Sequence, residues 1–403
     1  RDIPVYFPFA KDEAGQKAPY KIEKMKYYLI AGEPSGDLHG ANLIEGLRKA
    51  DPEAQFRFWG GDRMAAAGGA ANLAKHYRET SFFGIVQVLK NLRTIKRQML
   101  ECQADVAAFA PDVLILVDYP GFNMKMARWA KEHGIRTFYY IAPKVWAWRE
   151  WRVKAIRKYV DRLFIIFPFE RSYFPRHGIE PIFEGNPLVD AIEAKRAALP
   201  SPDEFRRRNG LDGRPIVALL AGSRRGEIRD NLPLMADLSK KFPGHQFVVA
   251  GVSWLDRALY EQYMAGSDIR YVCDQTYETL AAAEAAVVTS GTATLETALL
   301  GIPEVVVYRT LWFQVKLQPY VLNVPWVSLV NLNLGREAVA EIIQSGLDIT
   351  RAERELRAVV EGGSKREKML SDFDELRKVI GGPGASDRFA ARMVAELHAT
   401  EAQ

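Results

Sequence analysis

The chain has 403 residues, of which 48% are hydrophobic and 26% are charged, and its formal net charge is +5. This length exceeds one ordinary hydrophobic core and predicts two domains, and the composition excludes a disordered or fibrous chain. The basic balance favours anionic partners such as phosphate groups, an acidic membrane surface or nucleic acid, and the two distant cysteines predict a reducing compartment.

Short β-rich runs alternate with helical patterns from Met25 onward, whereas residues 1–24 are interpreted as an N-terminal extension. Strands are predicted at residues 27–31, 55–59, 113–117, 137–141 and 163–166, and then at 216–220, 246–250, 269–272, 286–289 and 304–308. Continuous apolar runs are typical of strands buried on both faces of a parallel sheet. The sequence therefore predicts an α/β fold with two doubly wound, Rossmann-like domains facing across a cleft.

The domain boundary is predicted in the Pro- and Gly-containing stretch 185–215, which has no strand pattern. We expect an N-terminal domain at 25–189 and a C-terminal domain at 190–382. From residue 336 the pattern is wholly helical, with helices expected at 336–344, 352–361, 367–380 and 387–399. The break at 381–384 would let the last segment, 383–403, cross back over the first domain or reach a partner subunit.

A turn of glycine and small hydroxyl residues follows the predicted strand at 286–289 and precedes a predicted helix. A helix start carries unpaired N–H groups and a partial positive charge, so it can hold a phosphate. Gly291 lets a ligand approach the backbone, and Ser290, Thr292 and Thr294 can donate hydrogen bonds. Glu296 can accept a pair of ribose hydroxyls. The sequence thus predicts a nucleotide site in the second domain.

A second turn of this kind, Gly222-Ser223-Arg224, follows the predicted strand at 216–220. A guanidinium can clamp a diphosphate through two hydrogen bonds. Together the two turns would stabilise a departing nucleoside diphosphate without a metal. Asn331, after a Pro-containing loop, is a further candidate nucleotide contact, or else a turn residue. The Asp-x-Asp motif at 372–374 is interpreted as a solvated face, so we expect no metal and no cofactor.

Two strand ends in the first domain carry carboxylates. Glu33 lies in the loop after the first strand and is expected to face sugar hydroxyls, although Ser35 or Asp37 there would also cap the next helix. Asp118 directly follows the buried run 113–117. Partial burial would raise its pKa toward the range of a general base, while its alternative is a helix cap, for which Asn123 is better suited.

Aromatic and basic residues are interleaved after the predicted strand at 137–141, which would suit a sugar or phosphate site. The candidates there are Trp146, Trp148, Arg149 and Arg152. The alternative is tryptophans packed at a domain edge beside a solvated basic face, and nucleic acid is not favoured because no recognised module accompanies the run.

A basic amphipathic helix is predicted over residues 85–99, which would suit a membrane surface. Its apolar face and the residues ahead of it supply the candidate membrane contacts Phe82, Phe83, Ile85, Val86, Val88 and Leu89. The ordinary alternative is a crossover helix that buries its apolar stripe on the sheet. No run of about 20 apolar residues predicts a spanning helix.

Taken in order, these motifs resemble those of the lipid-A-disaccharide synthases, inverting glycosyltransferases of the GT-B fold. The resemblance runs from Met25 to about Glu396 and rests on the segments 31–37, 83–89, 118–123, 145–149, 222–224, 290–296 and 328–331. It implies transfer of 2,3-diacylglucosamine from UDP to 2,3-diacylglucosamine 1-phosphate. The products would be a β-1,6-linked disaccharide of lipid A biosynthesis and UDP.

The resemblance also implies residue roles: Asp118 as base, Glu33 as the acidic loop residue, Arg224 as diphosphate ligand and Asn331 as an active-site amide. Acylated sugar-lipid substrates imply a peripheral position on the cytoplasmic face of the inner membrane. The family forms dimers by exchanging C-terminal segments, so a homodimer through the C-terminal helices is expected.

The chain departs from the family pattern at four positions, namely Gly121, Lys144, Asn186 and Ala221. Three alternatives remain: a peptidoglycan-type N-acetylglucosaminyltransferase, a UDP-sugar 2-epimerase, and a non-catalytic nucleotide-sugar-binding protein at the membrane. An epimerase needs no lipid-facing patch, so the amphipathic helix argues against it.

Overall fold

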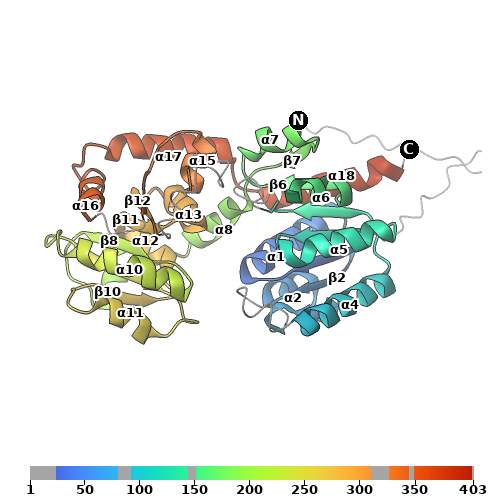
Figure 1. The fold of residues 1–403 in the computed structure, drawn as a ribbon, viewed down its shortest axis with the longest axis horizontal. Coiled ribbons are helices and arrows are strands. Elements are labelled where there is room, and N and C mark those ends of the chain that lie inside the picture. Colours follow the sequence, from blue (N-terminus) through green and yellow to red (C-terminus); the bar gives the residue numbers. More distant parts are fainter. Residues whose placement is uncertain (1–23, 80–91, 144–150, 310–325, 345–348, 402–403) are drawn as a thin grey trace, which may run out of the picture.

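The computed structural model describes residues 24–79, 92–143, 151–309, 326–344 and 349–401, and these ranges form two α/β units that lie side by side (Figure 1). The first unit is built on a seven-stranded, all-parallel sheet in the order β3-β2-β1-β4-β5-β6-β7. Its strands are β1 (Lys26–Ala31), β2 (Gln55–Gly60), β3 (Leu73–His76), β4 (Val113–Val117), β5 (Thr137–Tyr140), β6 (Arg162–Ile165) and β7 (Pro181–Phe183).

Helices cover both faces of this sheet because its central strands are apolar on both sides. Along β1, Leu29 packs into the core cluster that includes α1, and the next residue, Ile30, packs into a second cluster with residues of α4 and α5. The helices are α1 (Pro34–Ala50), α2 (Asp62–Gly68), α4 (Leu92–Phe109), α5 (Pro120–Glu132), α6 (Trp151–Tyr159) and α7 (Glu170–Tyr173), with short 3-10 turns at η1 (Ala70–Asn72), η2 (Tyr77–Glu79) and η3 (Phe174–His177).

The second unit contains a six-stranded parallel sheet in the order β10-β9-β8-β11-β12-β13. Its strands are β8 (Ile216–Leu220), β9 (Gln246–Gly251), β10 (Arg270–Cys273), β11 (Ala283–Thr289), β12 (Glu304–Arg309) and β13 (Ala340–Gln344). Its helices are α9 (Pro202–Asn209), α10 (Arg225–Ser239), α11 (Arg257–Met264), α12 (Thr276–Ala282), α13 (Thr292–Leu300), α15 (Leu329–Leu334), α16 (Ile349–Arg357) and α17 (Arg366–Ile380).

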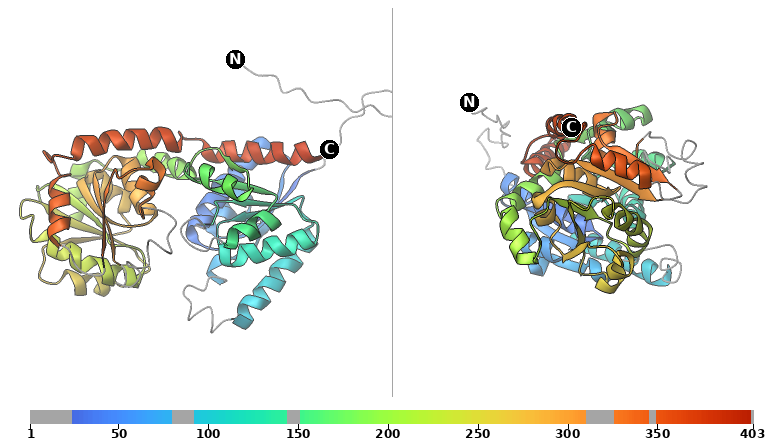
Figure 2. Two further views of the ribbon diagram at one scale, coloured as in Figure 1. Left: turned by 45° about the horizontal axis from the view of Figure 1, so that its top comes forward. Right: turned by 90° about the vertical axis from the view of Figure 1, so that its left-hand side faces the viewer.

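The chain passes between the two units twice. It leaves the first at α8 (Pro187–Arg196) and returns through a glycine-containing break into α18 (Ala385–Glu401) (Figure 2). The two crossings touch, because a Cβ on Gly381 would lie 3.4 Å from the Cα of Gly185. Asp190 of α8 accepts hydrogen bonds from Gly384 N (2.6 Å) and from Ser386 N and Oγ (2.9 Å each), and so it fastens the start of α18.

The last helix, α18, packs back onto the first unit of the same chain. The ring of Phe389 contacts the rings of Tyr140 and Phe164 edge-on, with centroids 5.2 and 6.2 Å apart, and Ala390 lies over Gly46 of α1. Within this chain the last segment therefore lies over the first unit, and its exchange between subunits stays a prediction.

The ten strands predicted from the sequence are all present, and the described ranges contain three further strands, β3, β7 and β13, that were not predicted. Two of the missed strands, β3 and β7, have only four and three residues and form the edges of the first sheet. The helix predicted at 336–344 is wrong, because residues Ala340–Gln344 form β13 and pair in parallel with β12. Backbone pairing at the open edge of the sheet prevails there over the helical preference of a short segment.

Candidate active site

Two loops lie side by side at the carboxyl edge of the first sheet. β1 and β4 are adjacent parallel strands with Ala31 opposite Val117, so the loops that begin at Gly32 and Asp118 leave from the same place. The ring of Tyr119 fills the space beside Gly32, since a Cβ on that glycine would lie 2.3 Å from Tyr119 Cδ1. Only a residue without a side chain fits there.

The second of these loops has an unusual backbone. Asp118 and Tyr119 both have left-handed φ angles, 44° and 49°, which are uncommon for residues other than glycine. Three hydrogen bonds hold the Asp118 main chain: its N–H donates to Tyr140 O (2.9 Å), and its carbonyl accepts from the Tyr139 hydroxyl (2.6 Å) and from Asn123 Nδ2 (2.8 Å). The backbone that carries the candidate base is therefore fixed by β5 and α5.

Asp118 shares its neighbourhood with Arg152, which is half-buried in α6. Burial raises the pKa of the Tyr139 phenol well above its usual value, the Asp118 carboxylate raises it further, and the Arg152 guanidinium lowers it. A carboxylate and a guanidinium thus act on the same phenol. Of the aromatic and basic residues predicted to line an acceptor site, the other three lie outside the described residues: Trp146, Trp148 and Arg149.

The two carboxylates of the first loop differ in their roles. Glu33 is half-buried at the start of α1 in an extended conformation, and it accepts a hydrogen bond from Ser35 Oγ (2.8 Å) without capping its own helix. Burial raises the pKa of Tyr119, and the charge of Glu33 raises it further. Asp37 is buried and accepts from the backbone N–H groups at the start of α2: Gly61 (2.7 Å), Arg63 (3.1 Å) and Met64 (3.1 Å). It caps a neighbouring helix.

The Ser290 turn lies at the point where the second sheet reverses its winding. The chain moves outward from β8 to β10 and then crosses to β11, so the loops after β8 and β11 flank the position where ligands of such sheets bind. Ser290 Oγ donates to Val327 O (3.0 Å) and Thr294 Oγ1 to Gly291 O (2.9 Å). Thr292 is exposed at the helix start. The hydroxyls of Ser290 and Thr294 are therefore used within the loop, and so are their N–H groups, which donate to Val307 O (3.0 Å) and Gly291 O (3.3 Å). This leaves the Thr292 hydroxyl and the first N–H groups of α13 for a phosphate.

The Gly222-Ser223-Arg224 turn leads into α10, and the carboxylate of Glu227 in that helix accepts hydrogen bonds from the N–H groups of the turn. Glu227 accepts hydrogen bonds from Ser223 N (2.8 Å) and Arg224 N (3.2 Å), and its other oxygen pairs with Arg224 Nη1 (3.1 Å). The side chain of Arg224 remains 75% exposed. Gly222 has a φ of 110°, and a Cβ there would lie 2.5 Å from the Glu227 side chain.

Glu296, predicted to bind ribose hydroxyls, lies in α13 and contacts the neighbouring helix α12. Tyr277 of α12 donates a hydrogen bond to Glu296 Oε1 (2.5 Å), and Lys195 of α8 lies 4.1 Å from the centre of the Tyr277 ring. Burial raises the pKa of Glu296, while Tyr277 and the charge of Lys195 oppose that rise. The carboxylate is thus directed toward α12, which also packs against β8 and β9.

Asn331 lies in the interior, and its amide is fully used there. It is 0% exposed; Nδ2 donates to Val339 O and Glu341 Oε1 (2.9 Å each), and Oδ1 accepts from Ala338 N (2.7 Å) and Val339 N (3.0 Å). This corrects the expectation of an amide that reaches the nucleotide. An amide group has this number of hydrogen-bonding positions, so no capacity remains for a ligand.

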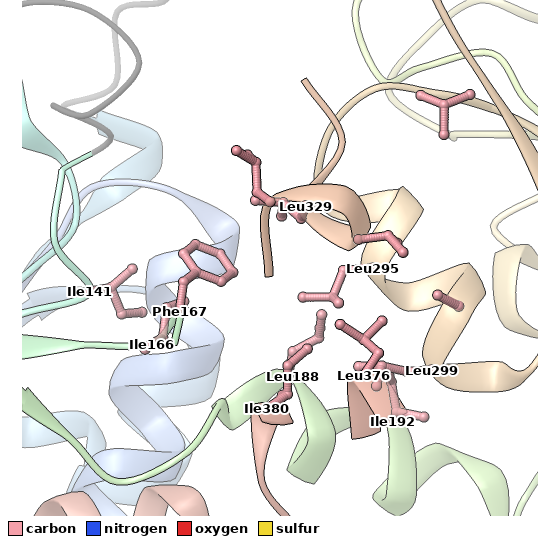
Figure 3. Packing of buried hydrophobic residues seen from close by; sticks show 14 of the residues in the cluster. Ile141, Ile166, Phe167, Leu188, Ile192, Leu295, Leu299, Leu329, Leu376 and Ile380 are labelled. Carbon is pink, nitrogen blue, oxygen red and sulfur yellow. The ribbon is translucent and has the colours of Figure 1, made fainter. Parts of the chain in front are cut away.

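The carboxyl edges of the two sheets are turned toward each other. In Figure 3, Ile141 and Phe167, which follow β5 and β6, lie on one side, and Leu295 of α13 and Leu329 of α15 lie on the other, with Leu188 of α8 beneath them. These residues belong to one cluster of buried hydrophobics. The carboxylates at the end of the first sheet and the turns at the end of the second therefore belong to facing edges.

Sequence reasoning missed Glu227, Tyr119 and Tyr277. Glu227 had a sequence signal, since a Glu three residues after a helix start is half of a capping box. Tyr119 and Tyr277 had none, because their contacts are with Gly32 and Glu296 from other elements.

The predicted membrane contacts lie in the segment 80–91, outside the described residues: Phe82, Phe83, Ile85, Val86, Val88 and Leu89. The part of that helix which the structure describes is α4, whose Met99 packs against the sheet while Arg93, Lys96 and Arg97 are exposed. None of the helices in the described ranges has the length and apolar character needed to span a bilayer.

The described ranges contain no group of three or more His, Cys, Asp or Glu side chains placed to hold a metal ion. In the Asp-x-Asp motif, Asp372 is buried and forms ion pairs with Arg336 and Lys368 (2.8 Å each). This corrects the expectation of a solvated face for Asp372, because α17 turns that carboxylate inward between two cations.

Solved structures with this arrangement include UDP-N-acetylglucosamine 2-epimerases and glycosyltransferases. A putative UDP-N-acetylglucosamine 2-epimerase from Listeria monocytogenes matches 94% of this chain and 98% of its own, with a TM-score of 0.66 and 14% identity. A calicheamicin glycosyltransferase matches 95% of this chain and all of its own, with a TM-score of 0.55 and 12% identity. At this level of identity the likeness defines the fold class, GT-B.

Sequence comparison is more specific than the fold. The family model described as lipid-A-disaccharide synthetase matches residues 27–386, and the chain belongs to this family. A lipid-A-disaccharide synthase of Myxococcus xanthus is 40% identical over 380 residues, covering 92% of this chain and 96% of the relative. One of Syntrophus aciditrophicus is 37% identical over 370 residues, covering 90% and 95%.

Proposed function

We propose that this chain transfers 2,3-diacylglucosamine from UDP to the 6-hydroxyl of 2,3-diacylglucosamine 1-phosphate, forming a β-1,6-linked disaccharide 1-phosphate and UDP. The observation that carries the proposal is the pairing of a fixed Asp118 loop on one sheet edge with two helix-start turns on the facing edge, in a chain of this family. The reaction belongs to lipid A biosynthesis.

In the proposed step the acceptor oxygen attacks the anomeric carbon on the face opposite UDP. The new C–O bond forms as the bond to the diphosphate breaks, which inverts the anomeric centre. Asp118 takes the proton of the acceptor hydroxyl. The fixed backbone of its loop supports this role, because a general base must be held within hydrogen-bond reach of the proton it removes. Glu33 in the adjacent loop would bind sugar hydroxyls, and Arg152 the acceptor phosphate.

The departing UDP gains negative charge as the bond breaks. The first N–H groups of α13 and the exposed Arg224 side chain would stabilise that charge electrostatically, without a metal. The Glu227 carboxylate holds Arg224 in place through one oxygen and would have to share that guanidinium with the diphosphate. Asn331 would act indirectly, by holding the backbone of α15 next to α13.

Acylated substrates lead us to propose a peripheral position on the cytoplasmic face of the inner membrane. The exposed cations Arg93, Lys96 and Arg97 of α4 and the exposed Leu100 support it. Co-sedimentation with anionic vesicles, but not with neutral ones, is expected. A homodimer through the C-terminal helices is a separate proposal, for which light scattering gives the test.

The experiment offers purified protein UDP-2,3-diacylglucosamine and 2,3-diacylglucosamine 1-phosphate and measures UDP and disaccharide. Both products are expected in equal amounts, with the rate unchanged by a chelator. A folded protein that binds UDP but releases neither product would contradict the transferase. Formation of an epimerised UDP-sugar without acceptor would favour the UDP-sugar 2-epimerase instead.

A further inference from the structure

An exposed tryptophan lies beside the candidate nucleotide turns. Trp254 is 68% exposed, more than any other large hydrophobic residue in the described part of the chain. It belongs to the turn between β9 and α11, at the same carboxyl edge as the Arg224 and Ser290 turns. Exposing an indole to water is unfavourable, so an indole held in place at a ligand-binding edge needs an explanation.

The Trp254 turn is fixed on both sides. The indole Nε1–H donates to Ser223 O (3.1 Å), which ties the ring to the β8 turn. On the other side, Ser253 N donates to Asp274 Oδ1 (2.9 Å), and Asp274 N donates to Gly251 O (2.9 Å). The polar atom of the indole is satisfied by the protein, and no ring or cation of the described residues stacks on its face.

The position of Glu296 indicates on which side of the switch point a nucleoside would lie. Its carboxylate contacts Tyr277 of α12, which packs against β8 and β9, and these two strands lie with β10 on the same side of β11. A diphosphate at the start of α13 with its ribose on Glu296 therefore directs the base over the loops after β8, β9 and β10. Trp254 follows the middle strand of these three.

We propose that Trp254 is a stacking residue for the uracil base of the donor, a specificity contact that rests on the proposed function and adds to it. Because the indole N–H already donates to Ser223 O, only the flat face of the ring is available to a ligand. This face suits stacking with a base and offers no hydrogen bond to a polar group. The alternative ligand for this exposed ring is an acyl chain of the donor. Binding measurements with UDP, which has no acyl chain, distinguish the base from the acyl chain.

The experiment measures the binding of UDP and of inorganic pyrophosphate by calorimetry, for the wild type and for Trp254→Ala and Trp254→Phe. Both variants lose the hydrogen bond to Ser223, but only alanine loses the ring, so phenylalanine is the matched control. We expect Trp254→Ala to weaken UDP binding about ten-fold, as loss of one aromatic–base stack does. Trp254→Phe should weaken it by less than about three-fold, and pyrophosphate binding should be unchanged in both.

Kinetics give a second readout, in which Trp254→Ala should raise KM for the donor and leave kcat at saturating donor unchanged. Equal weakening of UDP and pyrophosphate would overturn the proposal, because Trp254 would then only support the Ser223 turn. Unchanged UDP binding would also overturn it, and a raised KM for the acylated donor alone would assign the indole to the acyl chain. If the wild type binds no UDP, the proposed function itself fails, and this is seen before any variant is made.

Discussion

The ring of Tyr119 lies against the Cα of Gly32, and this contact joins the loop that carries Asp118 to the loop that carries Glu33. Replacing Gly32 by Ala would place a Cβ 2.3 Å from the Tyr119 ring, so the ring and its strained backbone must move. We expect a loss of about 1–3 kcal/mol of stability from overpacking. We also expect kcat to fall by up to about a hundred-fold, because catalytic groups displaced by 1 Å lose that much.

Gly121→Ala is the matched control, since a Cβ at Gly121 in α5 meets nothing within 4 Å. Thermal unfolding and initial rates measure both variants. A Gly32→Ala enzyme with normal stability and rate would show that the contact between the loops is unimportant.

Replacing Asp118 is expected to lower the rate of the reaction, whereas replacing Asp37 is expected to lower the stability of the fold. Asp118→Asn should lower kcat by about 10²–10⁴-fold, as loss of a general base does, with little change in melting temperature. Asp37→Ala should cost about 1–2 kcal/mol because α2 loses its cap, while the folded protein keeps its kcat. Melting curves and rates on both variants decide the assignment, and the base would have to be sought elsewhere if Asp118→Asn were fully active.

UDP binding should weaken on the acid side because protonated Glu296 no longer accepts ribose hydroxyls as a carboxylate. Burial raises the pKa of Glu296, so the loss should begin at a higher pH than for a solvent-exposed Glu, whose pKa is about 4.3. Tyr277→Phe removes a hydrogen bond that lowers this pKa, and the acid limb should therefore move to still higher pH.

The measurement is the dissociation constant of UDP against pH for the wild type and Tyr277→Phe, with Glu296→Gln as a reference that should be independent of pH in this range. An acid limb that stays in place in Tyr277→Phe would separate Glu296 from ribose binding.

Asn331→Ala should act on stability more than on nucleotide affinity. The substitution removes all four hydrogen bonds of a buried amide and leaves Glu341 with one donor fewer, so the melting temperature should fall by several degrees. At a temperature where the variant is folded, UDP affinity should change by less than about three-fold. A loss of UDP affinity greater than ten-fold in the folded variant would show that Asn331 contacts the ligand directly.

Local patterns were sufficient to predict most of the strands. Buried apolar runs such as residues 113–117 indicate parallel strands because the signal depends only on neighbours in the chain, and the anion-binding role of the Gly-Ser-Arg turn before α10 stays a prediction. Asp118 and Glu33 could be placed on one edge because parallel strands end together.

The remaining features depend on contacts between distant segments. Nothing local distinguishes Asp37 as the cap of another helix, or Asn331 as a buried amide bonded to residues 338–341. The local sequence of β13 favours a helix, and the segment forms a strand because it pairs with β12. Tertiary hydrogen bonds assign these roles, and a single sequence does not display them.

The packing of α18 on α1 has a consequence for the order in which the chain folds. The core of the first unit includes Phe389, Ala390 and Met393, which are synthesised some 200 residues after β7. A nascent chain that has completed the first sheet would still expose the apolar surface of Tyr140 and Phe164 until the second unit has been made. The first unit should therefore be a poor fragment to express alone, and its last folding step should follow that of the second unit.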